Sequence, residues 1–182
     1  MSKYALIMNV PGESPDTYSA VYEKDENYEL YVGTGSMDMA DELFKKLASE
    51  GFEHINLCGD FDDEITKRFI ESGQGKIKIS HASYLPEELE KLNKLPSLKE
   101  YGFISLTDGL DKMEKLELKS DECNSCIMLV TDMEMACLAA NELFESGTAF
   151  IELCSWFDLE KTKKIINSIN GKIPVGSCGI IM

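Results

Sequence analysis

Two short segments carry most of the side chains that could do chemistry. The first reads LCGDFDDE and contains Cys58 and Asp62, and the second reads IELCSWFDLE and contains Glu152, Cys154 and Asp158. A thiol beside a helix N-terminus can have a lowered pKa and act as a nucleophile, and carboxyl groups can act as general acids or bases. The segments therefore predict a polar site with Cys154, Glu152 and Asp158 as candidate catalytic residues. Cys58 and Asp62 are the corresponding ligand-binding candidates in the first segment.

The cysteines and aspartates also have a structural interpretation. Cysteine is a small apolar residue that suits a crowded strand end, and neither motif has a His or Lys directly beside the thiol. An aspartate at the start of a helix caps its unpaired amides and complements the helix dipole. We therefore expect packing for the thiols and capping for Asp62 and Asp158, with chemistry as the alternative.

Five further residues extend the predicted ligand-binding set. Trp156 lies at a strand–helix turn, where it either lines a pocket or packs against the other half of the chain. Gly176, followed by Ser177 and Cys178, would let a backbone approach an anionic group closely. His81 stands at the corresponding place in the first half, and its ordinary pKa suits acid–base chemistry, although a lone His at a strand end is often structural.

The sequence assigns neither a metal nor a cofactor. Cys123-Asn-Ser-Cys126 has the spacing of half a zinc site, but no second pair answers it. The pair also falls in a predicted hairpin turn and not at a helix N-terminus, where a redox pair is expected. No G-x-G-x-x-G or P-loop pattern is present, so we predict no metal and leave the cofactor unknown.

The two chemical segments belong to a duplicated unit. A shift of 96 residues aligns Met37–Ala82 with Met133–Cys178 without a gap, and 18 of the 46 positions are identical. Chance would give roughly one identity in fifteen positions for ordinary compositions. We therefore predict repeat one over 1–82, a helical connector over 83–100 and repeat two over 101–182.

Each repeat is expected to follow the order β-β-β-α-β-α-β. Apolar runs suit the first strand, and alternating patterns around a polar turn suit a hairpin. The last strands are expected over Lys76–Ser80 and Lys172–Val175. Strands joined through helices pair in parallel by right-handed crossovers. The fold class is therefore α/β: two pseudo-symmetric β-β-β-α-β-α-β repeats with mostly parallel sheets covered by helices.

The helices have recognisable ends. Ser36 and Asp132 are good N-cap residues for the first helix of each repeat, and Gly51 and Gly147 stand where a left-handed C-cap is wanted. Pro86 suits the first turn of a short helix in the connector. Because ligands bind beyond the carboxyl ends of parallel strands, both cysteine motifs are expected at the binding edge of a sheet.

The charge balance limits the partners. Eighteen Lys and Arg against 33 Asp and Glu give a net charge of −15. Such a surface repels phosphate backbones and anionic lipids, so we predict neither nucleic-acid nor membrane binding. The first residues run into a strand-like segment and there is no apolar run of ~20 residues, so we expect a cytoplasmic protein with reduced thiols.

The second half resembles a known signature. FIELCSWF followed by GKIPVGSCG is similar to the I-E-L-C-G-x-F … V-P-V-G pattern of an uncharacterised bacterial domain-of-unknown-function family. Repeat one matches less well, because Asn56 replaces the Glu and IKIS replaces V-P-V-G. The resemblance implies that a site built on Glu152 is intact in repeat two. It also implies a covalently fused dimer of single-copy relatives, and it brings no established activity.

Two functional hypotheses remain open at this point. The first is a cytoplasmic protein that binds a small polar metabolite at strand carboxyl ends, with lyase or isomerase chemistry if it is an enzyme. The alternative is a non-catalytic structural or assembly module, a fused pseudo-dimer in which the motifs are caps and packing. Either form is compatible with a homo-oligomer.

Overall fold

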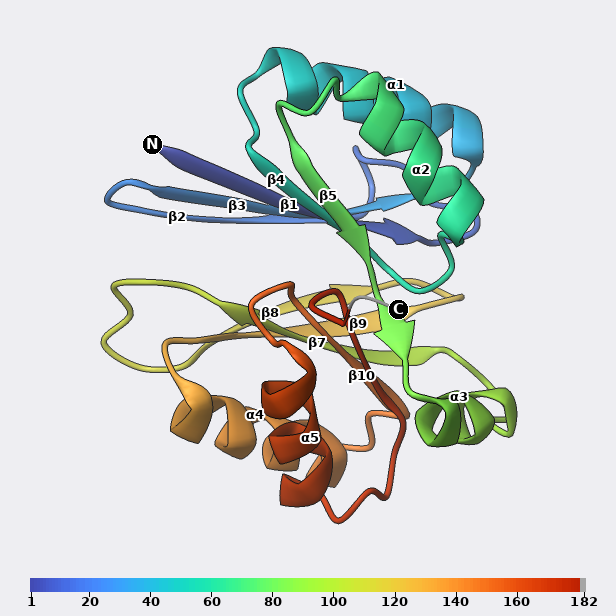
Figure 1. Ribbon diagram of the computed structural model, residues 1–182, viewed down its shortest axis with the longest axis vertical. Coiled ribbons are helices and arrows are strands. Elements are labelled where there is room, and N and C mark those ends of the chain that lie inside the picture. Colours follow the sequence, from blue (N-terminus) through green and yellow to red (C-terminus); the bar gives the residue numbers. More distant parts are fainter. Residues whose placement is uncertain (181–182) are drawn as a thin grey trace. The chain divides into compact units, whose positions relative to one another are not determined.

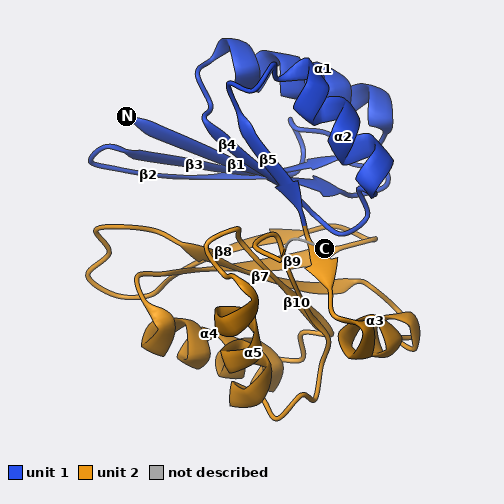
Figure 2. Cartoon of the chain, viewed as in Figure 1, with its two compact units in different colours: residues 1–81 blue, residues 82–182 orange. Residues whose placement is uncertain are grey.

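The chain folds as two compact units, each with its own sheet. The computed structural model describes residues 1–180. Unit 1 comprises Met1–His81, and unit 2 begins at Ala82. Figure 2 colours the two units separately.

Unit 1 contains five strands and two helices in the predicted order. Its elements are β1 (Ser2–Asn9), β2 (Ser19–Lys24), β3 (Asn27–Thr34), α1 (Met37–Ser49), β4 (His54–Leu57), α2 (Asp63–Ser72) and β5 (Lys78–His81). The strand order is β2-β3-β1-β4-β5. Only β2 runs antiparallel to its neighbour, since β1 pairs in parallel with β3 and β4, and β4 pairs in parallel with β5.

Unit 2 repeats this arrangement and adds a strand and a helix before it. Its elements are β6 (Ser83–Tyr84), α3 (Pro86–Asn93), β7 (Glu100–Leu106), β8 (Glu114–Lys119), β9 (Asn124–Val130), α4 (Met133–Glu145), β10 (Phe150–Leu153), α5 (Leu159–Ser168) and β11 (Val175–Ser177). The strand order is β6-β11-β10-β7-β9-β8. Apart from the added β6, this is the order of unit 1, which confirms the predicted α/β repeats.

The predicted helix ends are confirmed. The Ser36 side chain accepts a hydrogen bond from the amide of Met39 at the start of α1, and Asp132 caps α4 in the same way. Gly51 and Gly147 follow the two helices with φ of 85° and 95°. These left-handed values favour glycine, which has no Cβ to clash with the following carbonyl.

In unit 1 the helices α1 and α2 cover one face of the sheet, and in unit 2 α4 and α5 do so, as Figure 1 shows. In unit 1 the rings of Phe44 in α1 and Phe69 in α2 stack with centroids 5.0 Å apart. In unit 2 a Cβ on Gly102 would lie 3.1 Å from Leu143 of α4, so Gly102 faces that helix. Successive residues of a strand point to opposite faces. Tyr101 and Phe103 therefore point to the other side, which we call the helix-free face.

The last strand of unit 2 differs from the prediction. We expected Lys172–Val175, and the strand is Val175–Ser177. Pro174 has no N–H to donate to a sheet, so regular pairing begins after it, although its carbonyl accepts a bond from the amide of Ile151. In unit 1 the corresponding strand is Lys78–His81 and not Lys76–Ser80.

The connector forms an edge of unit 2. The strand β6, which the sequence did not predict, pairs antiparallel with β11. Pro86 opens α3 as predicted. Within α3, the buried carboxylate of Glu88 forms an ion pair with Lys91 and accepts a hydrogen bond of 3.2 Å from the amide of Val175. This contact satisfies the first amide of β11 and fixes the helix to the sheet.

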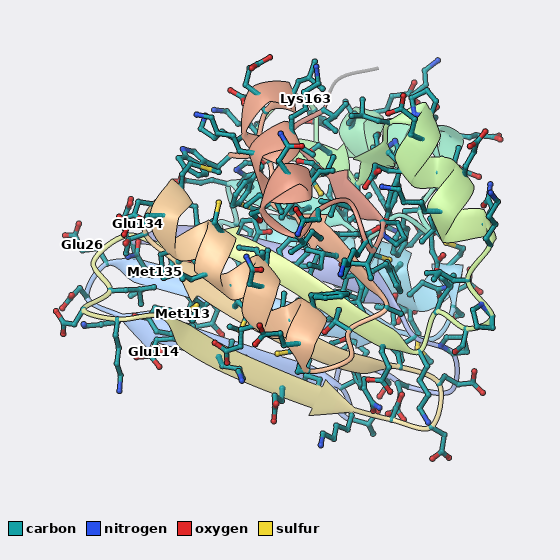
Figure 3. The ribbon with its side chains drawn as sticks, turned by 90° about the horizontal axis from the view of Figure 1, so that it is seen from below. Glu26, Met113, Glu114, Glu134, Met135 and Lys163 are labelled. Atoms are coloured by element: carbon teal, nitrogen blue, oxygen red, sulfur yellow. The ribbon has the colours of Figure 1, made fainter. Side chains whose placement is uncertain are left out.

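The acidic residues lie mostly on the surface. Glu26, in the turn between β2 and β3, and Glu134, in α4, are exposed and are labelled at the margin of the view in Figure 3. Within residues 1–180, no helix has the length and apolar character needed to cross a bilayer.

Candidate functional site

Cys58 and Cys154 occupy matching positions. Each thiol is buried just after β4 or β10. The amide of Asn9 donates to the sulfur of Cys58, and the amide of Leu106 donates to the sulfur of Cys154, both at 3.3 Å. In each unit the sulfur therefore accepts a bond from the end of the neighbouring parallel strand, β1 or β7. This geometry gives both thiols a role in the structure.

Asp62 and Asp158 are N-caps of α2 and α5. The Asp62 carboxylate accepts a bond of 2.8 Å from the amide of Ile65, and Asp158 accepts one of 2.9 Å from the amide of Lys161. The backbone and side-chain hydrogen bonds from Lys161 lower the pKa of Asp158. The Lys161 ammonium also lies 4.6 Å from the ring centre of Trp156, so this turn is closed by contacts within unit 2.

Ser177 supports the same turn from the neighbouring strand. Its buried hydroxyl donates to the carbonyl of Phe157 at 2.6 Å and accepts from the amide of Gly179 at 3.0 Å. The amide of Cys178 donates to the carbonyl of Leu153. At this edge of unit 2, the predicted ligand-binding groups thus hold the ends of β10 and β11 together.

The missing side chain of Gly176 leaves room for a tyrosine ring to lie over the backbone of β11. A Cβ on Gly176 would lie 2.6 Å from two ring carbons of Tyr84, which is its partner on β6. Such a distance is far below normal carbon contact. The close approach that the sequence suggested for an anionic ligand is therefore made by an aromatic ring of the protein.

The Tyr84 ring leads to a buried carboxylate. The hydroxyls of Tyr84 and Tyr101 donate to the two oxygens of Glu152 at 2.6 and 2.9 Å. All three side chains are at most 8% exposed. Glu152 pairs in register with Phe103, so the group lies on the helix-free face. We call Tyr84, Tyr101 and Glu152 the Tyr–Glu–Tyr cluster.

Unit 1 has a neutral group at the equivalent position. Asn56 replaces Glu152, and its amide oxygen accepts a bond of 2.8 Å from the hydroxyl of Tyr4. Its amide nitrogen donates to the hydroxyl of Ser80 at 3.0 Å. Ser80 stands where Gly176 stands in unit 2, because each is the register partner of the central polar residue. The first tyrosine is thus kept in both units, and only unit 2 has a carboxylate at this position. Unit 1 has its buried carboxylate on β3 instead, where Glu29, the register partner of Tyr4, accepts a bond of 2.7 Å from the hydroxyl of Tyr31.

The titratable groups at the carboxyl edge of unit 1 form two polar pairs. His81, the last residue of β5, has its Nε2 atom 2.6 Å from a carboxylate oxygen of Asp63 in the first turn of α2. Asn9, at the end of β1, donates to Asp60 at 3.3 Å. In unit 2 the position of His81 is taken by Ser177. His81, which the sequence analysis named as suited to acid–base chemistry, therefore has the carboxylate of Asp63 as its partner.

Cys123 and Cys126 lie on opposite sides of the sheet. The Cys123 sulfur is 3.4 Å from the hydroxyl of Ser125, whereas the Cys126 sulfur approaches Met128 at 3.9 Å. Because Ser125 and Cys126 are successive strand residues, the two thiols diverge. Burial raises the pKa of Cys126 to about 11. Within residues 1–180, no three His, Cys, Asp or Glu side chains gather as a metal site requires.

Three residues were not singled out from the sequence. Tyr101 stands in an apolar, strand-like segment, where a tyrosine is usually part of the core, and Tyr84 stands in the connector, where no pattern indicates a strand. Their bonds to Glu152 span 68 and 51 residues of chain, so no local pattern could reveal them. Asp63 was obscured by the adjacent cap. The doubled Asp62-Asp63 was the only available signal, since one carboxylate suffices to cap a helix.

A family model matches residues 2–97 and again residues 99–180, and its description is a family of unknown function, DUF6506. The chain belongs to this family, as two tandem copies. The matches confirm the predicted duplication and the resemblance to an uncharacterised domain. No curated protein matches the chain.

Two solved structures show a distant likeness. One is the transcription regulator CcpA of Lactococcus lactis, with 8% identity and a TM-score of 0.33 over 94% of this chain and 73% of that one. The other is a periplasmic solute-binding protein of an ABC transporter from Actinobacillus succinogenes with bound D-allose. It also has 8% identity and a TM-score of 0.33, over 96% of this chain and 77% of that one. Likeness at this level carries no functional argument.

Proposed function

We propose that unit 2 binds a small polar metabolite at the Tyr–Glu–Tyr cluster. The observation that carries this proposal is the difference between Glu152 and Asn56 at one position of the same fold. Unit 1 builds the same strand order around a neutral amide. The repeat therefore does not need a carboxylate at this place, and unit 2 has one nevertheless.

The energetics support a role beyond folding. A buried carboxylate loses its hydration, and its hydrogen bonds and neighbours must compensate for that loss. Replacing buried ionic groups with well-packed apolar residues is often neutral or stabilising. A carboxylate held at both oxygens by tyrosine hydroxyls is thus a costly way to fill the face of a sheet. Binding of a ligand would explain why unit 2 keeps a carboxylate whose burial is energetically unfavourable.

The geometry also suits binding. Glu152 and Tyr101 lie on regular strands, and the Tyr84 ring is confined by Gly176. Binding groups on strands hold their orientation better than groups on loops. A ligand that meets groups already fixed in place loses less affinity to their ordering.

Thermal unfolding with a panel of polar metabolites tests the proposal. A ligand at 100 times its dissociation constant stabilises the folded state by about 2.7 kcal/mol. For a chain of this size that corresponds to roughly 5 to 11 °C in Tm. We expect such a shift for the natural protein and its loss in Glu152→Gln, while Asn56→Ala in unit 1 keeps it. Equal shifts in all three proteins would mean that the metabolite binds elsewhere and would contradict the proposal, whereas the absence of a shift with every metabolite would favour the assembly module.

A second candidate function is proton transfer in unit 1, and the His81–Asp63 pair favours it. A carboxylate that bonds one ring nitrogen fixes the orientation of a histidine side chain, as general acid–base catalysis requires. Lyase and isomerase reactions on small polar metabolites depend on such transfers. His81→Gln should abolish turnover and leave metabolite binding in unit 2 unchanged. If the variant retains turnover of a metabolite that the natural protein converts, this candidate fails.

A further inference from the structure

The surroundings of Glu152 are aromatic. The Tyr101 ring lies 5.2 Å from the ring of Phe150 and 6.4 Å from that of Phe103, centre to centre. Both phenylalanines share the helix-free face with Glu152, one as its register partner on β7 and the other two residues before it on β10. The Tyr84 ring crosses from the other side, over Gly176. The carboxylate is thus framed by rings on both sides.

Aromatic rings around a carboxylate form a setting that favours positive charge. The face of an aromatic ring attracts a cation, most strongly where water is excluded, and an ionised carboxylate adds a direct opposite charge. The two hydroxyls that bond Glu152 contribute hydrogen bonds and no charge. Carboxylate and phenol oxygens are also acceptors, so a hydroxyl or N–H group on the same cation can add a hydrogen bond to the attraction of its charge.

From these observations we propose that the Tyr–Glu–Tyr cluster selects a small organic cation with an ammonium group. This inference rests on the proposed function and names the class of its ligand. Neutral polyols are the main competing class, since they also donate hydrogen bonds and stack on rings. The comparison with unit 1 argues against them, because an amide such as Asn56 could serve a polyol equally well. The feature that distinguishes residue 152 from residue 56 is a carboxyl group, which carries a negative charge when ionised and accepts a phenol hydrogen bond at each oxygen.

The net charge of the chain acts in the same direction. At −15 it raises the local concentration of small cations around the protein and lowers that of anions. This effect is general and is screened by salt, whereas the cluster provides a local and partly desolvated charge. The two contributions can therefore be separated by their dependence on ionic strength.

The test changes the charge of the ligand and of the protein in turn. Choline and dimethylbutanol, its uncharged carbon isostere, have nearly the same shape, and sorbitol represents the polyols. Each is titrated calorimetrically against the natural protein, Glu152→Gln and Asn56→Ala at constant ionic strength. We expect choline to bind the natural protein and Asn56→Ala at least tenfold more tightly than dimethylbutanol. In Glu152→Gln that preference should disappear.

The outcomes separate the inference from the proposed function. If sorbitol or dimethylbutanol binds as well as choline and Glu152→Gln weakens that binding, the metabolite site stands and the cation is wrong. If no probe binds the natural protein, the cation inference is wrong, and the metabolite panel decides the site separately. Should Glu152→Gln fail to fold, Tyr84→Phe and Tyr101→Phe keep the charge and each removes one hydroxyl. The preference for choline over its isostere should then persist, and its loss in both variants would contradict the inference.

Discussion

Substitution of Gly176 by alanine is the sharpest test of how the Tyr–Glu–Tyr cluster is built. The new Cβ would lie 2.6 Å from ring carbons of Tyr84, whereas carbon atoms pack at about 3.5 to 4.0 Å. The ring must therefore move by about 1 Å. A shift of that size takes the Tyr84 hydroxyl from 2.6 Å to beyond hydrogen-bonding distance of Glu152.

Two physical effects set the magnitude. Overpacking a dense region costs about 1 to 3 kcal/mol, and losing a hydrogen bond to a charged group costs about 1.5 to 3 kcal/mol. The lower ends of these ranges together give about 2.5 kcal/mol of lost stability for Gly176→Ala. Trp156 is the single tryptophan of the chain and lies in unit 2, so its fluorescence during urea unfolding reports on the unit concerned.

A double-mutant cycle isolates the contact. With Tyr84→Ala already present, Gly176→Ala should change stability by less than about 0.5 kcal/mol, because no ring remains to displace. Ser80→Ala at the equivalent position of unit 1 should leave the fluorescence transition unchanged. A Gly176→Ala protein as stable as the natural one would refute the packing argument. An equal loss with and without Tyr84 would show that another contact is responsible.

Three further predictions concern other parts of the fold. Glu88→Ala removes the oxygen that accepts the Val175 amide and should therefore cost about 1.5 to 3 kcal/mol of local stability, measured as faster hydrogen exchange at that amide. Cys126, whose pKa burial raises to about 11, should resist alkylation at pH 8 in the folded protein and react after unfolding, as mapped by mass spectrometry. The pKa of Asp158 is lowered in the folded state, so its contribution to stability is present above its ordinary pKa and is lost as the pH falls through the folded value. Asp158→Asn should remove that dependence from urea titrations between about pH 7 and pH 3.

Each of these predictions has a result that would contradict it. Unchanged exchange at Val175 in Glu88→Ala would mean that the sheet holds this amide without α3. Rapid alkylation of Cys126 at pH 8 would show that the thiol is neither shielded nor raised in pKa. If stability falls equally with decreasing pH in the natural protein and in Asp158→Asn, other carboxylates are responsible for the acid sensitivity.

Much of the fold follows from local chemistry that the sequence states directly. The self-alignment revealed the duplication, and apolar runs and turns gave the order of strands and helices. Ser36 and Asp132 cap helices whatever surrounds them, because a side-chain oxygen satisfies amides only three residues away. Asp62 and Asp158 were recognised as caps for the same reason. Interactions between residues this close in the chain can be predicted from the amino-acid sequence alone.

The connector marks where local patterns stop being informative. Pro86 correctly predicted the start of α3. Nothing near Ser83 or Tyr84 indicated a strand, because a strand of two residues is too short to show an alternating pattern. Pairing with β11 creates β6, and β11 lies about ninety residues further along the chain. Pro174 likewise delayed β11 relative to an apolar run that suggested an earlier start.

The sequence by itself determined two α/β repeats, their caps and the motif that contains Glu152. Only the tertiary structure decided that Tyr84 and Tyr101 meet this carboxylate, that Gly176 serves a ring, and that Asp63 pairs with His81. The physical reason is range. Capping and periodicity act within a few residues, whereas register between distant strands selects which polar groups share a face, and that choice is made when the sheet assembles.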